Sequence, residues 1–155
     1  MSESLNVCVL LGGPSAEREV SLRSGAAAAR ALRSLGHRVT EVDALPGWSL
    51  PGGTDVVFLA LHGTYGEDGT VQAELERLGV GYTGCGVEAS RVAFDKVLTK
   101  RRLVEAGVPT ARFEVIDRAD AGWPAGWAPP VVLKPVRQGS SVGLQFVEET
   151  GAWRS

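Results

Sequence analysis

Residues 7–15 read Val-Cys-Val-Leu-Leu-Gly-Gly-Pro-Ser, a continuous apolar run that ends in a glycine-rich turn. A strand that is apolar on both faces is typical of a parallel sheet covered by helices. A helix is expected next, because Ser15 can cap it and Glu17 lies in its first turn, where the helix dipole favours negative charge. Gly36 ends this helix as a left-handed cap. The apolar face predicted for the helix comprises Leu22, Ala26, Ala29, Leu32 and Leu35.

The pattern of alternating strands and helices continues to about residue 93. Residues 38–43 alternate as a strand nearer the sheet edge would, and residues 56–61 are again apolar throughout. A helix is expected over residues 71–78 and another from about residue 88, on either side of a short segment at residues 80–83. This order predicts an α/β domain over residues 1–93, with a Rossmann-like parallel sheet and right-handed crossovers.

The second half of the chain has a different pattern. Residues 87–106 read as helix, either one or two with a bend, closed by Gly107 and Pro109. Residues 112–117, 131–134 and 142–147 read as strands, and the short loops between them favour an antiparallel sheet. We place a second domain at residues 94–155. Its core is thin for an independent domain, because it has only one helix and a few short strands.

Composition excludes several classes of protein. The 155 residues are 44% hydrophobic and carry 16 basic against 18 acidic side chains, which argues against disorder and against nucleic-acid binding. No run of about 18 apolar residues predicts a membrane span, and no secretory signal is recognised. Cys8 and Cys85 lack the spacing of a metal site. We expect a soluble cytoplasmic protein without a metal site of its own.

Two polar, glycine-rich segments follow the predicted buried strands, at residues 12–19 and 62–69. Ligands bind outside the carboxyl ends of parallel strands, so these segments are candidates for one site. Glu17 could hold an ammonium group, and His62 could hold or protonate an oxygen while Glu67 or Asp68 orients it. A purely structural reading stays open, with Glu17 as a helix-dipole residue and His62 as a turn residue.

A phosphate site is predicted in the second half. The Walker A spacing is absent, and residues 84–89 match only the looser dinucleotide pattern, which keeps open a nicotinamide- or flavin-dependent oxidoreductase. Lys134 is a stronger candidate, because a lysine that ends an apolar strand is costly to desolvate unless it meets an anion. The glycine-containing loop beside it could close its N–H groups over phosphate oxygens, and Lys96 could supply a second ammonium.

Four segments in order, residues 11–21, 60–72, 94–96 and 134–143, carry a resemblance to a known family. The most specific is His62-Gly63-Thr64-Tyr65-Gly66-Glu67-Asp68-Gly69. From about residue 5 to residue 147 the chain resembles the N-terminal part of the D-alanine–D-alanine ligases of the ATP-grasp superfamily. Residues 1–93 would then be the first domain, and residues 94–155 the opening of the ATP-grasp central domain.

The resemblance implies ATP-dependent ligation of two D-alanines through an acyl phosphate, with Mg²⁺ assisting, for peptidoglycan and hence cell-wall synthesis and cell shape. It implies that Glu17 anchors the ammonium of the first D-alanine and that His62, supported by Glu67, lies near the acyl phosphate. Ser140 would join Glu17 in a network that closes the site. The residues implied to contact ATP are Lys96, Lys134, Gly139, Ser140, Ser141, Val142 and Gly143.

The resemblance also implies parts of the family's site that this sequence does not contain. The magnesium ligands, the oxyanion arginine and most of the adenine pocket are expected beyond residue 155, so we expect no turnover by this chain alone. D-alanine and ATP are the expected partners, together with a second copy of the chain bound through residues 1–93. The alternative is a non-catalytic remnant of such a ligase that self-associates or binds a ligand.

Overall fold

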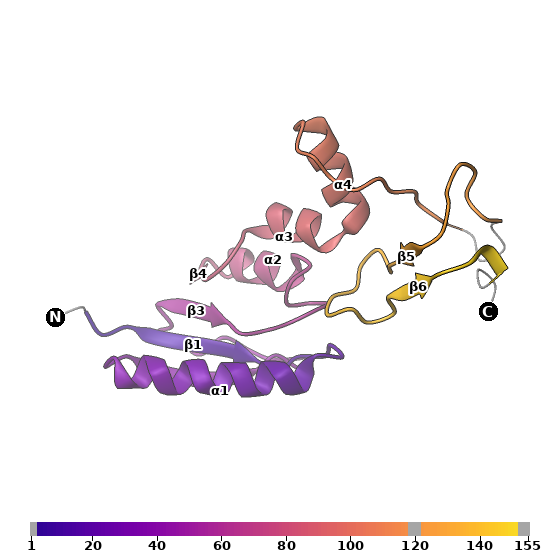
Figure 1. The fold of residues 1–155 in the computed structure, drawn as a ribbon. Helices are drawn as coiled ribbons and strands as arrows, with labels where there is room; N and C mark the ends of the chain where they lie inside the picture. The colour runs from indigo at the N-terminus through magenta and orange to yellow at the C-terminus, as the bar shows by residue number, and fades with distance from the viewer. Residues whose placement is uncertain (1–2, 118–121, 152–155) are drawn as a thin grey trace. The chain divides into compact units, whose positions relative to one another are not determined.

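The computed structural model describes residues 3–117 and 122–151 (Figure 1). The chain divides into two compact units, Met1–Ala93 and Phe94–Ser155. The predicted α/β class is confirmed, with a parallel sheet in the first unit and a small antiparallel sheet with a helix in the second.

The first unit is built on a four-stranded parallel sheet in the order β2-β1-β3-β4. Its strands are β1 (Asn6–Leu11), β2 (Arg38–Asp43), β3 (Val56–Leu59) and β4 (Gly81–Tyr82). β1 pairs with β2 along its whole length and with β3 from Val7 to Leu10. The central position of β1 explains its unbroken apolar sequence, because both of its faces are covered by helices.

The two faces of β1 belong to separate hydrophobic clusters. Val7, Val9 and Leu11 pack with Ala29 of α1 (Arg18–Ser34), whereas Cys8 and Leu10 pack with side chains of α2 (Thr70–Arg77). Figure 1 shows α1 running along one face of the sheet, with α2 on the opposite side of it. This division follows from the two-residue period of a strand.

Helix α1 ends as predicted, with Gly36 in the left-handed conformation, but it differs from the prediction in its N-cap and in the position of Leu35. Its N-cap is Glu17 and not Ser15, because Ser15 instead forms a turn whose hydroxyl accepts a hydrogen bond from the Glu17 N–H at 3.0 Å. Leu35 is 70% exposed, so its assignment to the apolar face was wrong. Leu35 is the C-cap, and Gly36 follows it with φ +90°, where the chain turns away from the helix axis.

Close packing of α1 on β1 depends on Gly25, which the sequence pattern did not single out. An added Cβ at this position would lie 2.5 Å from the Cβ of Leu11. Ser21, one turn earlier, is fully buried and donates a hydrogen bond to the Ala60 carbonyl at 2.6 Å. The small size of Gly25 and the hydrogen-bonded hydroxyl of Ser21 thus allow α1 to pack closely near the end of β3.

The second unit contains α4 (Lys96–Glu105), β5 (Val131–Leu133) and β6 (Gln145–Val147), while α3 (Val87–Phe94) spans the division between the units. The predicted bend in the helical region is present, because Asp95 is extended and caps α4. β5 and β6 are antiparallel, with Val132 paired to Phe146. This sheet agrees with the antiparallel prediction for the second half.

The strand predicted over residues 112–117 is absent, although these residues are all described. The segment is tied down by side chains: Arg112 donates to the Gly126 carbonyl at 3.0 Å, and Glu114 accepts from the Trp127 indole at 2.8 Å. The strand predicted over residues 142–147 is also shorter, because the chain turns until Gln145. Among the described residues, no helix is both long and apolar enough to cross a lipid bilayer.

Candidate functional site

The first unit brings the two predicted loops together at the carboxyl ends of the adjacent strands β1 and β3. Ser15, in the loop after β1, donates a hydrogen bond to the carbonyl of His62, in the loop after β3, at 2.7 Å. The parallel pairing of β1 with β3 is what aligns these two ends. The prediction that residues 12–19 and 62–69 meet at one edge of the sheet agrees with this geometry.

The loop after β1 is fixed by an ion pair with the end of β2. Arg18 contacts both carboxylate oxygens of Asp43, at 2.8 and 2.6 Å, and also donates to the Gly13 carbonyl at 3.2 Å. The Gly13 N–H donates to Asp43 at 3.1 Å. The guanidinium of Arg18 lowers the pKa of Asp43, and the same hydrogen bond raises the pKa of Arg18. The pair holds the backbone that leads into Glu17.

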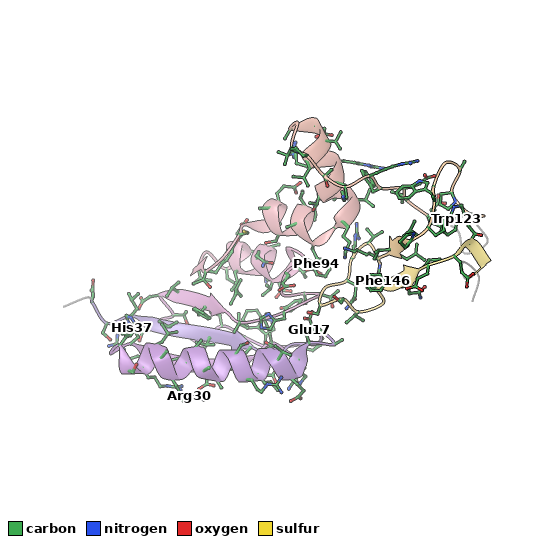
Figure 2. The ribbon with its side chains drawn as sticks, viewed as in Figure 1. Glu17, Arg30, His37, Phe94, Trp123 and Phe146 are labelled. Atoms are coloured by element: carbon green, nitrogen blue, oxygen red, sulfur yellow. The ribbon has the colours of Figure 1, made fainter. Side chains whose placement is uncertain are left out.

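Glu17 lies against the loop after β3. An added Cβ on Gly63, whose φ is +70°, would lie 2.6 Å from Oε2 of Glu17 and 3.3 Å from Oγ of Ser15. Gly63 is therefore required twice, for its left-handed backbone and for the close approach of the carboxylate. Figure 2 shows Glu17 at the N-terminal end of α1, the end of the helix that favours an anion.

His62 contacts one side chain at each ring nitrogen. Its Nε2 lies 3.0 Å from the Ser24 hydroxyl, and its Nδ1 lies 3.7 Å from Oε1 of Glu67. Of the two carboxylates predicted to orient the ring, Glu67 is the one near it. The distance of 3.7 Å is longer than a hydrogen bond between these atoms would be. Ser24 was missed by the sequence reasoning, since only the placement of α1 on the sheet brings it to His62.

Asp68 has a different role from the one considered for it. Its carboxylate accepts hydrogen bonds from the N–H groups of Tyr65, at 2.9 Å, and Thr70, at 3.0 Å. Burial by itself would raise the pKa of Asp68, but these hydrogen bonds lower it. Asp68 therefore shapes the turn that leads into α2 and does not orient His62.

Tyr65 lies in the same loop as His62, but its side chain contacts other residues. Its hydroxyl accepts from the Trp48 indole at 2.5 Å and donates to Glu74 at 2.7 Å. Burial and the hydrogen bond to Glu74 raise the pKa of Tyr65 to about 12. Its backbone has φ 72°, which is uncommon outside glycine and marks a tightly constrained loop. A cavity of about 310 Å³ lies beside Tyr65 and is also lined by Pro14 and Trp48.

In the second unit, the start of α4 is joined to the predicted phosphate loop. The Lys96 ammonium donates to the Gln138 carbonyl at 2.6 Å, and the Lys96 N–H donates to the Val136 carbonyl at 3.0 Å. Asp95 caps the helix through the N–H groups of Val97 and Leu98 and pairs with Arg137 at 2.8 Å. These hydrogen bonds lower the pKa of Asp95, and the largest contribution comes from the Leu98 N–H.

Lys134 directly follows β5 and is exposed, so the argument from a desolvated lysine does not apply to it. Within residues 3–117 and 122–151, it has no hydrogen bond or ion pair, which leaves its ammonium to solvent. Lys96 differs, because one of its three donors is already used. The two lysines lie in the same unit, where Lys134 precedes the loop in the chain and Lys96 contacts the loop at Gln138.

The loop over residues 139–143 is tightly folded. Ser140, Ser141 and Gly143 all have positive φ, at 49°, 60° and 72°. An added Cβ on Gly143 would lie 2.8 Å from Pro135, so the loop packs closely on its own beginning. The N–H groups of Val142 and Leu144 donate within the loop, to Gly139 and Ser141. The Val142 N–H therefore does not have the freedom that the sequence prediction assumed.

The predicted site residues thus form two groups. Glu17, His62 and Glu67 gather in the first unit, and Lys96, Lys134 and residues 139–143 gather in the second. Ser140 and Glu17, which the family resemblance links in one network, belong to different units.

Known proteins with similar sequences are D-alanine–D-alanine ligases. Residues 38–85 match a family model described as the D-ala D-ala ligase N-terminus. The chain is 49% identical over 148 residues to the D-alanine–D-alanine ligase of Aquifex aeolicus, which covers 93% of the chain and 51% of that protein. It is 45% identical over 161 residues to the ligase of Polaromonas naphthalenivorans, covering 94% of the chain and 48% of that protein.

Solved structures give a consistent result. The D-alanyl-alanine synthetase A of Vibrio cholerae superposes with a TM-score of 0.84 at 26% identity, over 99% of this chain and 55% of that one. The D-alanine–D-alanine ligase of Aeromonas hydrophila gives a TM-score of 0.66 at 32% identity, over 72% of this chain and 50% of that one. The chain spans about half the length of the relatives it matches, and the resemblance to the N-terminal portion of these ligases is confirmed.

Proposed function

We propose that this relative of the N-terminal portion of D-alanine–D-alanine ligases supplies the amino-acid site and part of the nucleotide site of such an enzyme. The reaction is the ATP-dependent joining of two D-alanines through an acyl phosphate, in the cytoplasm, for peptidoglycan synthesis. The observation that carries the proposal is the position of Glu17, with its carboxylate against Gly63 and beside the loop of His62. The relatives named above support the choice of substrate.

In the amino-acid site, Glu17 holds the ammonium group of the first D-alanine. A charge-assisted hydrogen bond to a carboxylate is stronger than one between neutral groups, which suits an ammonium ligand. His62 holds an oxygen of the reacting carboxyl group, and Glu67, 3.7 Å from Nδ1, supports the ring. Rigid placement matters more than covalent help in this reaction, since phosphoryl transfer depends on positioning and charge.

In the nucleotide site, Lys96 and Lys134 contact ATP phosphates, and residues 139–143 cover them. The exposed ammonium of Lys134 and the two remaining donors of Lys96 fit an anionic ligand. ATP supplies the phosphoryl group that turns a poorly reactive carboxylate into an electrophile. By the family resemblance, Ser140 joins Glu17 in a network that closes the site.

The described residues contain no cluster of metal-binding side chains of the kind that holds a metal ion by protein groups alone. Within residues 3–117 and 122–151, no group of three or more His, Cys, Asp or Glu side chains could hold a metal ion. Mg²⁺ usually takes one or two carboxylates together with substrate phosphates, so we propose that it assists the reaction bound in part by the phosphates of ATP.

The test is calorimetric titration of the chain with D-alanine, and with L-alanine as the control for stereochemistry. We expect Glu17→Gln to weaken D-alanine binding roughly tenfold or more, because it removes a charged partner of the ammonium. Glu19→Gln is the matched control, since Glu19 is an exposed carboxylate in the first turn of the same helix. Equal affinities for the two variants, or no binding of D-alanine by the unaltered chain, would overturn the proposal.

The nucleotide site is tested in the same way with ATP. Lys134→Ala should weaken ATP binding, whereas Arg101→Ala should not, because Arg101 is an exposed cation on the side of α4 that we predict to face solvent. Self-association through residues 1–93 is also part of the proposal and is tested by analytical ultracentrifugation. A monomer at all concentrations would contradict that part alone.

A further inference from the structure

His62 is held between two groups that differ in what they can donate. Its Nε2 lies 3.0 Å from the hydroxyl of Ser24, and its Nδ1 lies 3.7 Å from the carboxylate of Glu67. A neutral imidazole carries its proton on one nitrogen only, so the chemistry of the ring depends on which of these neighbours meets the proton.

The Ser24 hydroxyl has one proton and two possible acceptors. It lies 3.2 Å from the Ser21 carbonyl, the ordinary bond of a helical serine to its own helix, and 3.0 Å from Nε2 of His62. If the proton points to Ser21, then Nε2 must supply a proton of its own. If the proton points to the ring, then Nε2 is an acceptor and the ring proton is on Nδ1.

Glu67 decides between these arrangements. An ionised carboxylate only accepts hydrogen bonds. If Nδ1 carried no proton, its lone pair would face the lone pairs of the Glu67 carboxylate, which is unfavourable. With the proton on Nδ1, the ring faces Glu67 with a donor, and Ser24 donates over the shorter of its two distances. At 3.7 Å the Nδ1–H is not taken up by Glu67, so it remains available to a ligand oxygen or a bridging water.

We propose that Ser24 is a positioning residue that holds neutral His62 with its proton on Nδ1, the nitrogen that then meets the ligand. The tautomer follows from the contacts in the first unit alone. That the ligand is the carboxyl group of D-alanine rests on the proposed function above.

His37 provides an internal reference, because it is the other of the two histidines in the chain. Its Nδ1 accepts a hydrogen bond from the Leu5 N–H at 3.2 Å, so its proton belongs on Nε2. Figure 2 shows His37 at the opposite end of α1 from Glu17, so a change at the site does not reach it directly. The two histidines are therefore expected in opposite tautomers.

The experiment is long-range ¹H–¹⁵N correlation NMR of the ¹⁵N-labelled chain, at a pH where both rings are neutral. Protonated and bare imidazole nitrogens give well-separated signals, so each tautomer is read directly. We expect a proton on Nε2 of His37 and on Nδ1 of His62, the latter favoured by roughly five to one or more, the scale of one hydrogen bond. A proton mainly on Nε2 of His62 would overturn the proposal without any variant.

Variants test the role of the hydroxyl. Ser24→Ala should return His62 to a mixture of tautomers and leave His37 unchanged, and Ser24→Thr should restore the Nδ1–H form. Ser34→Ala is the matched control, because Ser34 makes the same bond to a carbonyl three residues back, 2.7 Å to Ala31, on the same helix. An unchanged His62 tautomer in Ser24→Ala would overturn the positioning role, and the His37 signals verify that each variant is folded.

A second titration separates this inference from the proposed function. If both hold, D-alanine shifts the Nδ1 signal of His62 more than the Nε2 signal. If the tautomer is as expected but D-alanine leaves both signals unchanged, then the positioning role stands and the ligand assignment fails. If D-alanine binds while the tautomer is wrong, then the assignment of Ser24 fails and the proposed function stands.

Discussion

The two units hold their candidate residues by different means. In the first unit, Glu17 and His62 are fixed by a parallel sheet whose central strand is buried, and by side chains such as Ser15 and Arg18 that bind loop backbone. In the second unit, Lys134 and residues 139–143 are carried by two three-residue strands, and Phe146 is 74% exposed. A two-stranded sheet is marginally stable alone. The proposed amino-acid site thus rests on a buried sheet, whereas the proposed nucleotide site has weaker support.

The largest expected effect tests this contrast in the cores. Leu10→Ala should destabilise the first unit by about 2–5 kcal/mol, because Leu10 is fully buried on the face of β1 that packs against α2. The matched substitution in the second unit is Phe146→Ala, which should change stability by less than about 0.5 kcal/mol, because the ring is mostly exposed. Hydrogen exchange of the strand amides measures each unit separately. Similar losses in both units would break the contrast.

A smaller effect tests how the first unit holds Glu17. Gly63→Ala should cost about 1–2 kcal/mol for its left-handed backbone and should also weaken D-alanine binding, because its Cβ would displace the carboxylate. Gly36→Ala is the control, since Gly36 also has positive φ but an added Cβ would meet nothing within 4 Å. Chemical unfolding and D-alanine titration measure the two effects. Equal loss of affinity in both variants would contradict the role of Gly63.

The smallest expected effect is on the stability of the protein at acidic pH. Asp43 and Asp95 both have lowered pKa values, so each contributes stability that is present above the unfolded value of about 3.9 and is lost as pH falls through the folded value. The first cause is Arg18 for Asp43, but the Leu98 N–H for Asp95.

Replacing the arginines should therefore separate the two aspartates. Arg18→Met should return the pKa of Asp43 most of the way to its ordinary value, whereas Arg137→Met should leave Asp95 mostly lowered. NMR titration of the carboxyl signals measures both. Equal shifts in the two variants would show that the helix cap contributes little to Asp95.

Local patterns predicted the elements whose signals lie close together in the chain. The apolar run at residues 7–11, the bend before Lys96 and the antiparallel pair around residues 131–147 all agree with the structure. The alternating segment at residues 112–117 did not form a strand, because alternation specifies which face a side chain takes but does not supply a neighbouring strand. Side chains hold that segment to the loop around Trp127 instead.

The candidate site was predictable only in part for the same reason. Loops that follow adjacent parallel strands must share an edge, so Glu17 and His62 could be grouped from sequence. Ser24 could not, since its contact with His62 depends on how α1 rests on the sheet, which Gly25 and Ser21 determine by close packing. The argument for a desolvated Lys134 failed because burial depends on neighbours far away in the chain.

Sequence alone determined the order of the elements, the α/β class and the resemblance to the ligases, since these follow from hydrophobic period, turn residues and motif spacing. Tertiary structure alone decided which atoms touch: Glu17 against Gly63, Ser24 on one nitrogen of His62 and Glu67 near the other. The physical reason is range. Periodicity and turn preferences act over a few residues, whereas a hydrogen bond between α1 and the loop after β3 exists only once the sheet has set both in place.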